Sequence, residues 1–402
     1  MPRIFLVNRY FFPDESATSQ LASDLAFYLA GERFEIRVIT SGQLYADATA
    51  RLPSAEVIRG VHIERLNGSR FGRQSIAGRM VDYATFYVSA AVRLFRGLRR
   101  GDTVVSMTDP PLLASMCSVV ARLRGARLIN WVQDVFPEVA ERLGTIRNKS
   151  LARILQRLRD DGLRHAAANV VIGERMSRMV GDITGQEPIL LPNWALEEGT
   201  EDAIPLREEW ELHDKFIVGY SGNLGRAHHL SGLIDVAAAL RHTRVVFLFV
   251  GAGAQLSALK ARVSELQLSN VIFKPYQPRK RLRQSLCLPD IHVVSLDPAL
   301  EGLIVPSKFV GVIAVGKPVL CLGSAQGEIG TLVGDSRCGL VFDPSCVREI
   351  ADALAALSEN PAALERMAGA ALHLWRSHFQ RSSALNRWSA LLRDTQAQQK
   401  CA

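Results

Sequence analysis

The sequence contains no apolar run long enough to cross a membrane as a helix. Such a helix needs roughly 20 apolar residues, and the nearest candidate, residues 83–92, is bounded by Asp82 and Arg93. The N-terminal segment 1–12 is typical of a first strand and not of a cleaved secretion signal. We therefore expect neither a spanning helix nor a secretion signal.

Cysteine is also scarce. The chain has six cysteines among 402 residues, with no CxxC pair and no histidine at metal-ligand spacing. This pattern favours reduced thiols, no metal site and a cytoplasmic protein. A G-x-G-x-x-G fingerprint is missing from the first loop, where residues 8–20 read NRYFFPDESATSQ. A dinucleotide-dependent oxidoreductase is therefore disfavoured.

Acidic residues are few between positions 59 and 100. This segment has nine arginines against Glu64 and Asp82, a balance of 9 − 2 = +7, while the whole chain carries +8. A basic amphipathic helix can lie on an anionic membrane, or it can be a core helix with a solvated arginine face. No nucleic-acid motif accompanies the charge, so nucleic acid is not an expected partner. The expected apolar face comprises Met80, Tyr83, Tyr87, Ala91, Leu94 and Leu98.

The chain begins twice in the same way. Residues 3–29 and 216–240 each run from an apolar stretch through a polar loop into apolar residues at helical spacing. Strands and helices alternate after both, which predicts α/β domains with parallel sheets. We expect two Rossmann-like domains that face an interdomain cleft. Their boundaries are 1–195 for the first domain, 196–215 for an acidic linker and 216–381 for the second, with a terminal helix 382–393 that returns to the first domain.

A glycine-bearing loop follows the first strand of the second domain. It contains Gly222, Asn223, Gly225, Arg226 and His228. Backbone amides in such a loop can approach a phosphate, and Arg226 could add a cation. A glycine turn between a strand and a helix is also common without any ligand.

A second expected helix start lies at Ser307 and Lys308. Pro306 precedes Ser307, and apolar residues then recur at helical spacing, so Ser307 is an expected N-cap. A helix N-terminus favours an anion, although helices that carry a cation there also occur without ligands. Two such helix starts in one domain would suit a diphosphate, which needs several donors and a cation.

Several segments together resemble glycosyltransferase family 4, retaining enzymes of the GT-B fold. The resemblance spans nearly the whole chain and includes the opening helix, the strand 34–41 and the terminal helix 382–393. Its further segments are WVQDVFPE (131–138), LLPNWA (190–195), YSGNLGRAHHLSGLI (220–234) and VPSKFVGVIAVGKPVL (305–320). The resemblance is to the branch that assembles bacterial polysaccharides and O-antigens, and within it to amino-sugar transferases.

The chain departs from the family pattern at three points. The two glutamates that many members place eight residues apart fall at Leu303 and Gly311. The lysine downstream of the first glycine falls at His228, and a histidine of the first domain falls at Gln133, beside Asp134. The ribose contact must then come from elsewhere, and Glu301 is not automatically its replacement.

The resemblance implies transfer of a sugar, such as N-acetylfucosamine or N-acetylglucosamine, from a UDP-sugar with retention and without a cofactor. The acceptor would be a bacterial surface polysaccharide on polyprenyl diphosphate. The enzyme would lie on the cytoplasmic face of the inner membrane and contact it through residues 59–100. Alternatives are a sugar-nucleotide 2-epimerase of the same fold and a non-catalytic sugar-nucleotide-binding protein. The expected catalytic residues are Arg226, Lys308 and Asp134, and the expected donor-binding residues are Gly222, Asn223, Gly225, His228, Gly251, Tyr276, Glu301 and Ser307.

Overall fold

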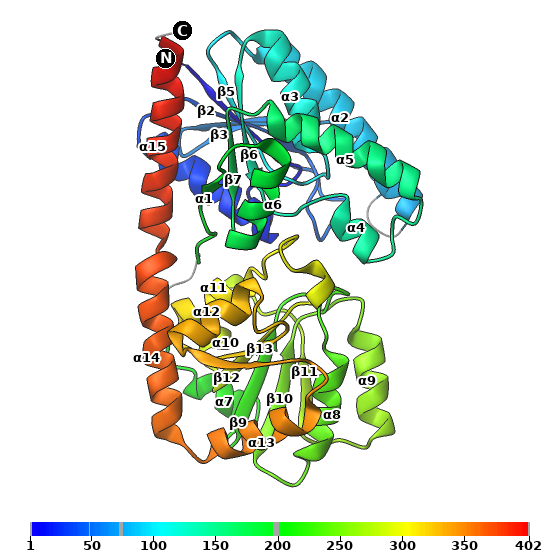
Figure 1. The fold of residues 1–402 in the computed structure, drawn as a ribbon, viewed down its shortest axis with the longest axis vertical. Helices are drawn as coiled ribbons and strands as arrows, with labels where there is room; N and C mark the ends of the chain where they lie inside the picture. The colour runs from blue at the N-terminus through cyan, green and yellow to red at the C-terminus, as the bar shows by residue number, and fades with distance from the viewer. Residues whose placement is uncertain (1, 48, 72–74, 196–200, 401–402) are drawn as a thin grey trace. The chain divides into compact units, whose positions relative to one another are not determined.

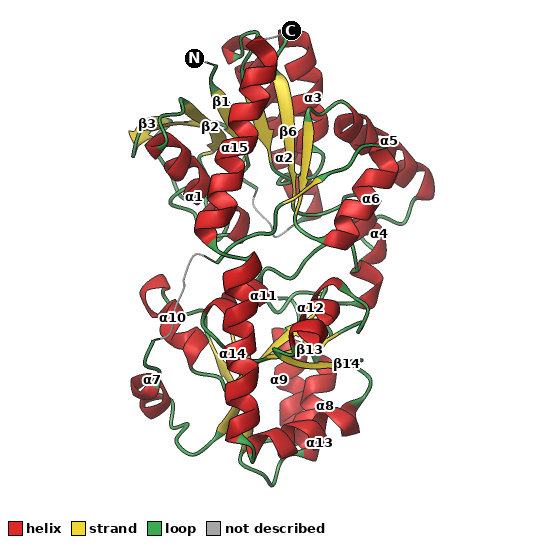
Figure 2. Ribbon diagram, turned by 60° about the vertical axis from the view of Figure 1, so that its left-hand side comes forward, coloured by secondary structure: helices red, strands yellow, loops and turns green. Residues whose placement is uncertain are grey.

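The computed structural model describes residues 2–47, 49–71, 75–195 and 201–400. The chain divides into two compact units, which are Met1–Pro192 with Ser382–Ala402, and Asn193–Arg381. Each unit is an α/β structure in which helices pack on a largely or wholly parallel sheet (Figures 1 and 2). The expected α/β class with two Rossmann-like domains is confirmed, and the cleft between them stays a prediction.

The first unit is built on an eight-stranded sheet in the order β3-β4-β2-β1-β5-β6-β7-β8. All neighbours pair in parallel except β3 and β4. Strands buried on both faces need continuous apolar runs, and β1 is such a run. The strands are β1 (Ile4–Val7), β2 (Ile36–Ser41), β3 (Ala55–Ile58), β4 (Val61–Leu66), β5 (Thr103–Ser106), β6 (Arg127–Val132), β7 (Ala168–Val171) and β8 (Ile189–Leu190).

Seven helices accompany this sheet in the described residues. They are α1 (Ala17–Gly31), α2 (Ile76–Gly97), α3 (Leu113–Arg124), α4 (Glu138–Arg142), α5 (Lys149–Arg164), α6 (Glu174–Thr184) and α15 (Arg381–Lys400). The terminal helix α15 packs on the first unit through Trp388. Its ring lies 4.8 Å from that of Trp131 on β6, centroid to centroid, and both rings are fully buried. The hydroxyl of Tyr28 donates to Asn386 at 2.6 Å.

The stretch 57–67 alternates between apolar and polar residues, as a single strand would, but it is part of a hairpin. Strands β3 and β4 are antiparallel and are joined by Arg59 and Gly60, whose φ angles are +49° and +81°. Positive φ at both central residues is the geometry of tight two-residue hairpin turns, and glycine adopts it easily. The two residues therefore reverse the chain within the expected strand.

The expected apolar face of α2 is confirmed at Leu94 and Leu98, which are buried, and is wrong at Met80. The buried stripe runs through Asp82, Phe86, Ala90 and Leu94, whereas Met80 is exposed. Asp82 is buried, and it forms an ion pair with Arg9 and accepts hydrogen bonds from Ser69 and Phe71. A buried charge needs such partners, and they allow a charged residue to lie on the buried side of the helix, in line with Phe86 and Ala90. Positions 72–74 of the basic segment lie outside the described residues.

The second unit has a six-stranded, fully parallel sheet in the order β11-β10-β9-β12-β13-β14. Numbered within the unit, this is the order 3-2-1-4-5-6 of dinucleotide-binding folds. The strands are β9 (Phe216–Ser221), β10 (Val245–Val250), β11 (Val271–Lys274), β12 (Ile291–Ser295), β13 (Val319–Leu322) and β14 (Gly339–Phe342). The helices are α7 (Ile204–Glu209), α8 (Ser231–Ala239), α9 (Leu256–Glu265), α10 (Arg279–Cys287), α11 (Lys308–Ala314), α12 (Glu328–Ser336), α13 (Val347–Ser358) and α14 (Pro361–His378).

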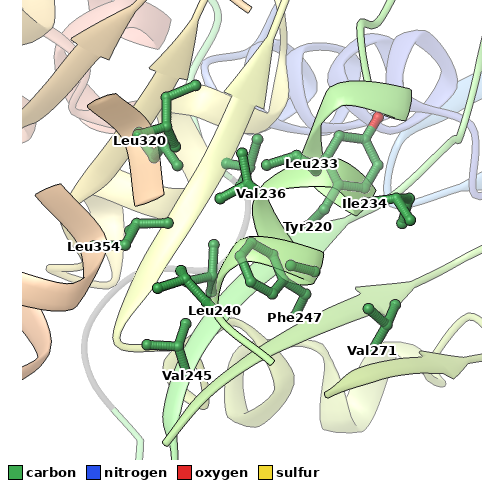
Figure 3. Close-up of a cluster of buried hydrophobic side chains, with 14 of the residues drawn as sticks. Tyr220, Leu233, Ile234, Val236, Leu240, Val245, Phe247, Val271, Leu320 and Leu354 are labelled. Atoms are coloured by element: carbon green, nitrogen blue, oxygen red, sulfur yellow. The ribbon is translucent and has the colours of Figure 1, made fainter. Parts of the chain in front are cut away.

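Apolar side chains fill both faces of this sheet. Figure 3 shows Leu233 and Val236 of α8, and Leu240 directly after it, beside Phe247 of β10, and each is almost fully buried. Burying such a side chain contributes about 1.5–3 kcal/mol. This core holds the ends of β9 and β12, and the loops that follow them, in place.

The segment expected as a linker is partly folded. Residues 196–200 lie outside the described residues, but α7 follows at Ile204–Glu209. Leu206, Trp210 and Leu212 are buried in a cluster with Val246 and Leu248 of β10. Its acidic composition suggested solvent exposure, but these apolar positions fold it against the sheet of the second unit.

Candidate functional site

The strand order of the second unit reverses between β9 and β12. The loop after β9 leads to α8, and the loop after β12 leads to α11. These two loops therefore leave the carboxyl edge of the sheet in different directions. Ligands of open α/β sheets bind at such a point. Most of the expected donor-binding residues lie on these loops.

Gly222 permits the close approach that defines the site. Its φ is +123°, and a β-carbon there would lie 2.6 Å from Cε of Lys308. Gly251, after β10, has a φ of +139°, and its β-carbon would lie 2.1 Å from the carbonyl oxygen of Gly222. Only glycine accepts these contacts, and the Lys308 side chain therefore lies directly across the loop.

The ammonium group of Lys308 is held by three neighbours. It donates to the hydroxyl of Tyr220 at 2.6 Å and to the carbonyl oxygen of Asn223 at 3.2 Å. Nε2 of His228 lies 3.3 Å away, and the centroid of the Tyr220 ring lies 4.4 Å away. The Tyr220 hydroxyl itself donates to the same Asn223 carbonyl at 2.6 Å. All four residues thus form one connected group.

The tautomer of His228 follows from its contacts. Nδ1 lies 2.5 Å from the carbonyl oxygen of Ser295, which can only accept a hydrogen bond. Nδ1 therefore carries the proton, and Nε2 accepts from Lys308. Burial and the nearby Lys308 charge lower the pKa of His228 to about 4. The ring is neutral at physiological pH.

Lys308 is a half-buried cation that no carboxylate neutralises within the described parts of the chain. Burial lowers its pKa to about 7, because removing a charge from water disfavours the charged form. Burial also raises the pKa of Tyr220 above its ordinary value, so this hydroxyl stays protonated. An arriving anion would stabilise the ammonium form of Lys308.

A cavity of about 220 Å³ adjoins this group. It is lined by Gly222, Tyr276 and Lys308 of the expected residues, together with Ser285, His292 and Gly311 among others. The Tyr276 ring lies beside Gly251, with a hydroxyl 3.3 Å from the carbonyl of Ala252. Lys308 therefore lies in the wall of the cavity, next to Gly222.

The loop amides are only partly available. Those of Gly222 and Leu224 donate to the carbonyls of Val250 and Ala252 at 2.8 and 2.9 Å. These two amides extend the pairing between the strands. Fewer loop amides than expected are therefore available to a phosphate. Among the described residues, nothing accepts from the amides of Asn223 and Gly225.

Arg226 lies in the same loop, with an exposed guanidinium group. None of the described residues pairs with it, so it is available to a ligand. It is not among the residues that line the cavity.

Ser307 does not cap α11 as expected. Its backbone is helical, with φ −60° and ψ −23°, and its exposed side chain makes no capping hydrogen bond. The helix itself is only seven residues long. Lys308, which begins it, is oriented by Tyr220 and His228 and not by a helix cap.

The carboxylate of Glu301 is already engaged. One oxygen accepts from the amide of Glu328 at 3.1 Å, at the start of α12, and a β-carbon on Gly327 would lie 2.2 Å from the other. A carboxylate is favourable at a helix N-terminus. Glu301 therefore supports α12 in this structure.

Asp134 belongs to the first unit, after β6, and its side chain keeps contact with solvent. The negative charge of Asp109 disfavours ionisation of Asp134 and so acts to raise its pKa. The contact expected between Asp134 and the acceptor stays a prediction.

The sequence does not predict two residues of the site. Tyr220 belongs to a buried apolar strand, and only its place next to the strand end could have indicated that its hydroxyl lies at the sheet edge. Ser285 lies within α10, is almost fully buried, and its hydroxyl has no hydrogen-bond partner among the described residues. No pattern in the sequence marks it.

The described residues contain no cluster of three histidine, cysteine or acidic side chains that could hold a metal ion. None of their helices combines the length and apolar character needed to cross a bilayer.

Comparison with known proteins identifies the second unit. Residues 203–373 match the family described as Glycosyl transferases group 1. The chain is 27% identical over 354 residues to the probable glycosyltransferase WbjE of Pseudomonas aeruginosa, with 86% of each chain covered. It is 24% identical over 352 residues to WcaI of Escherichia coli K12, a glycosyl transferase assigned to colanic acid biosynthesis, covering 82% of this chain and 85% of WcaI.

Solved structures share the fold across nearly the whole chain. Sucrose-phosphate synthase from Thermosynechococcus elongatus matches with a TM-score of 0.78 at 15% identity, covering 99% of this chain and 100% of the other. HepE from Anabaena in complex with UDP-glucose matches with a TM-score of 0.71 at 16% identity, covering 98% and 100%. The second unit is thus a glycosyl transferases group 1 domain, and the chain is a glycosyltransferase with the GT-B fold.

Proposed function

We propose that the enzyme transfers a sugar from a UDP-sugar, with retention, to a bacterial surface polysaccharide carried on a lipid. The observation that carries the donor site is the half-buried ammonium group of Lys308, which pairs with no carboxylate among the described residues and lies beside a cavity at the strand-order reversal. A diphosphate is the anion that suits it, because its charge would compensate the desolvated cation.

The diphosphate would be held by Lys308 and Arg226. Departure of the donor's nucleoside diphosphate places negative charge on the β-phosphate, and preorganised donors lower the energy of that state. Lys308 is already oriented by Tyr220 and His228. The acceptor hydroxyl would attack on the face that the leaving group departs from, and a phosphate oxygen would take its proton. No protein nucleophile is needed.

The nucleoside would occupy the 220 Å³ cavity. Tyr276 offers an aromatic face, and the free hydroxyl of Ser285 offers a hydrogen bond to the ribose or base. Gly311, at the position where many relatives have a glutamate, leaves the cavity wall without a carboxylate. Uracil is favoured as the base because HepE, which shares the fold, was solved with UDP-glucose.

The acceptor would be bound by the first unit, with Asp134 near the reacting hydroxyl. WcaI is assigned to colanic acid biosynthesis, which supports a surface polysaccharide as the product. An N-acetylated amino sugar is the proposed group transferred, on the resemblance of the 131–138 and 190–195 segments. A polyprenyl diphosphate carrier on the inner membrane would account for the arginine excess in residues 59–100.

Thermal unfolding with UDP, GDP, ADP, dTDP and NAD tests the donor site. A ligand that binds only the folded protein at a hundredfold excess over Kd stabilises it by about 2.7 kcal/mol. We expect a selective rise with UDP that Lys308→Ala abolishes, followed by transfer from UDP-N-acetylglucosamine or UDP-N-acetylfucosamine to a polyprenyl-linked saccharide. Stabilisation by NAD alone, or UDP binding that Lys308→Ala leaves unchanged, would contradict the proposal.

A further inference from the structure

A second, smaller cavity lies within the first unit. Its volume is about 10 Å³, enough for one water-sized group. It lies at the carboxyl ends of β1, β2 and β4, where the loops after these strands meet the first half of α2. Its polar lining includes Arg9, Ser41, Asn67, Arg70 and Asp82.

This cavity adjoins the point where the strand order of the first sheet reverses. Strand β2 lies on one side of β1, and β5 lies on the other. The backbone amide of Arg9, after β1, donates to the carbonyl oxygen of Asp109, after β5, at 2.8 Å. Ligands of open α/β sheets bind at such a point. Arg9 therefore lies at the edge of the sheet where a ligand of the first unit is expected.

The guanidinium group of Arg9 is buried but incompletely paired. The residue is 3% exposed, and the guanidinium carbon lies 5.1 Å from the ring centroid of Tyr10 and 4.9 Å from that of Tyr83. Nη2 lies 3.5 Å from the Asp82 carboxylate and 3.4 Å from Oε1 of Gln43. Charge-assisted hydrogen bonds are usually about 2.7–2.9 Å long. The group is thus held in place by contacts that leave it weakly hydrogen-bonded.

Further donors at the cavity lack an acceptor. Among the described residues, nothing accepts from Nε or Nη1 of Arg9. Ser41 is 9% exposed, and its oxygen accepts weakly from the amide of Gln43 at 3.4 Å. The Ser41 hydroxyl proton has no acceptor in the described parts of the chain. Buried donors without acceptors are costly, so an oxygen atom in the cavity would be stabilised.

The charge around the cavity is positive. Arg9 and Arg70 line it against one carboxylate, that of Asp82. Arg70 is exposed, and its one hydrogen bond within the described residues goes to the carbonyl of Ala50 at 3.3 Å. A β-carbon on Gly42 would lie 4.0 Å from Nη2 of Arg70, so this guanidinium lies beside Gly42 in the cavity wall. An excess of one positive charge favours an anionic oxygen over a neutral one.

We infer that this cavity binds one anionic oxygen of the saccharide acceptor, belonging to a carboxylate or a phosphate group. The inference rests on the proposed binding of the acceptor by the first unit, and it adds the charge that the acceptor carries. Guanidinium groups suit both anions, because their N–H groups match the spacing of the oxygens. The cavity admits a single oxygen, and the rest of the group would stay outside it, within reach of Arg70. A water molecule would fill the cavity without offsetting the positive charge.

Ligand-observed NMR titrations test the inference with three probes. Glucuronate carries a carboxylate, glucose 1-phosphate carries a phosphate, and glucose is the neutral control. The titrations use Lys308→Ala, so that the cation of the donor site cannot contribute. We expect at least one anionic probe to bind about tenfold or more tightly than glucose, and salt to weaken its binding.

The two anions distinguish the source of the charge. Preferential binding of glucuronate would identify a carboxylate on an acidic sugar of the acceptor. Preferential binding of glucose 1-phosphate would identify a phosphate, such as that of the carrier. If neither anion bound more tightly than glucose, the cavity would be a site for water only and the inference would be overturned.

Substitutions in the same Lys308→Ala background locate the bound anion. Arg70→Gln removes an exposed charge and should weaken anion binding about 3- to 5-fold at low salt. Arg9→Lys keeps a buried charge beside Asp82 but loses the paired N–H groups, and it should weaken binding about tenfold. Arg178→Gln, an exposed arginine on α6, is the matched control and should leave anion affinity unchanged.

Ser41→Ala provides a further variant that leaves both arginines in place. It should weaken anion binding about threefold, and thermal unfolding shows which variants are folded. Unchanged anion affinity in the folded variants of Arg9, Ser41 and Arg70 would overturn the inference. UDP binding by the wild-type protein, measured in parallel, reports separately on the donor site. UDP binding without anion binding contradicts only the acceptor cavity, and anion binding without UDP binding contradicts only the proposed donor.

Discussion

The ammonium group of Lys308 lies 2.6 Å from the hydroxyl of Tyr220, and no carboxylate in the described residues shares that ammonium. Tyr220 in turn donates to the Asn223 carbonyl, and His228 accepts from the other side of Lys308. All three neighbours are neutral. These neighbours thus orient the ammonium group of Lys308 but do not neutralise its charge. The charge remains available to an anionic ligand.

Replacing Lys308 with alanine should reduce sugar transfer about 100-fold or more, the typical effect of removing one donor from a developing oxyanion. Stability of the free protein should be unchanged or slightly higher, because burying an ammonium group is costly. Steady-state transfer and thermal unfolding check both effects. Tyr220→Phe is the control: it keeps the charge and should lose less activity. Equal losses in the two variants would mean that orientation, not charge, is what matters.

UDP affinity should fall as pH rises above 7, because the pKa of Lys308 is about 7 and the diphosphate favours its protonated form. The decrease should approach tenfold per pH unit between pH 7 and 9. His228 stays neutral in this range, since its pKa is about 4, and Tyr220 stays protonated. Calorimetric titration with UDP measures the trend.

The titration of Lys308 affects the free energy of unfolding in the opposite direction from UDP affinity. Between pH 7 and 10.5 the unfolded chain binds a proton at Lys308 that the folded protein releases. The contribution of Lys308 to the free energy of unfolding therefore rises with pH in this range. Lys308→Arg keeps its charge and should flatten the pH profile of UDP affinity. A profile as steep as that of the wild type would assign the titration to another group.

Ser285→Ala should raise the stability of the free protein by about 1 kcal/mol, because it removes a buried hydroxyl without a partner. If the nucleoside enters the cavity, the same change should weaken UDP binding about 3- to 10-fold. Ser118→Ala is a matched control, since Ser118 is equally buried and unpartnered but lies on α3 of the first unit. It should raise stability alone. Unchanged UDP affinity of Ser285→Ala would exclude a nucleoside contact at this hydroxyl.

Gly222→Ala should weaken UDP binding about tenfold or more and cost about 1–3 kcal/mol of stability. The new β-carbon would displace Cε of Lys308, and φ +123° is unfavourable for alanine. Gly334→Ala serves for comparison: it lies in α12 with no neighbouring atom within 4 Å, and it should stabilise the helix by up to about 1 kcal/mol. UDP titrations of both variants decide whether the close approach of Lys308 matters.

Local sequence patterns sufficed for the α/β class and for most strands. Residues 216–221 and 245–250 are buried apolar runs in a helix-strand alternation, and such runs form parallel strands whatever their partners. The glycines of the 222–230 loop likewise predicted a tight turn. Residue spacing along one segment was enough in these cases, because the determining interactions are close in sequence.

Tertiary contacts decided what local patterns could not. Lys308 is 88 residues from Tyr220 and 80 from His228, so only the folded sheet brings them together and burial sets their pKa values. The buried side of α2 includes Asp82, whose partner Arg9 is 73 residues away, and α7 packs on β10 through Leu206 and Trp210. Sequence alone therefore determined the α/β class, most of the strands and the loop that bears the site. Contacts between distant residues determined which side chains are charged, buried or available to a ligand.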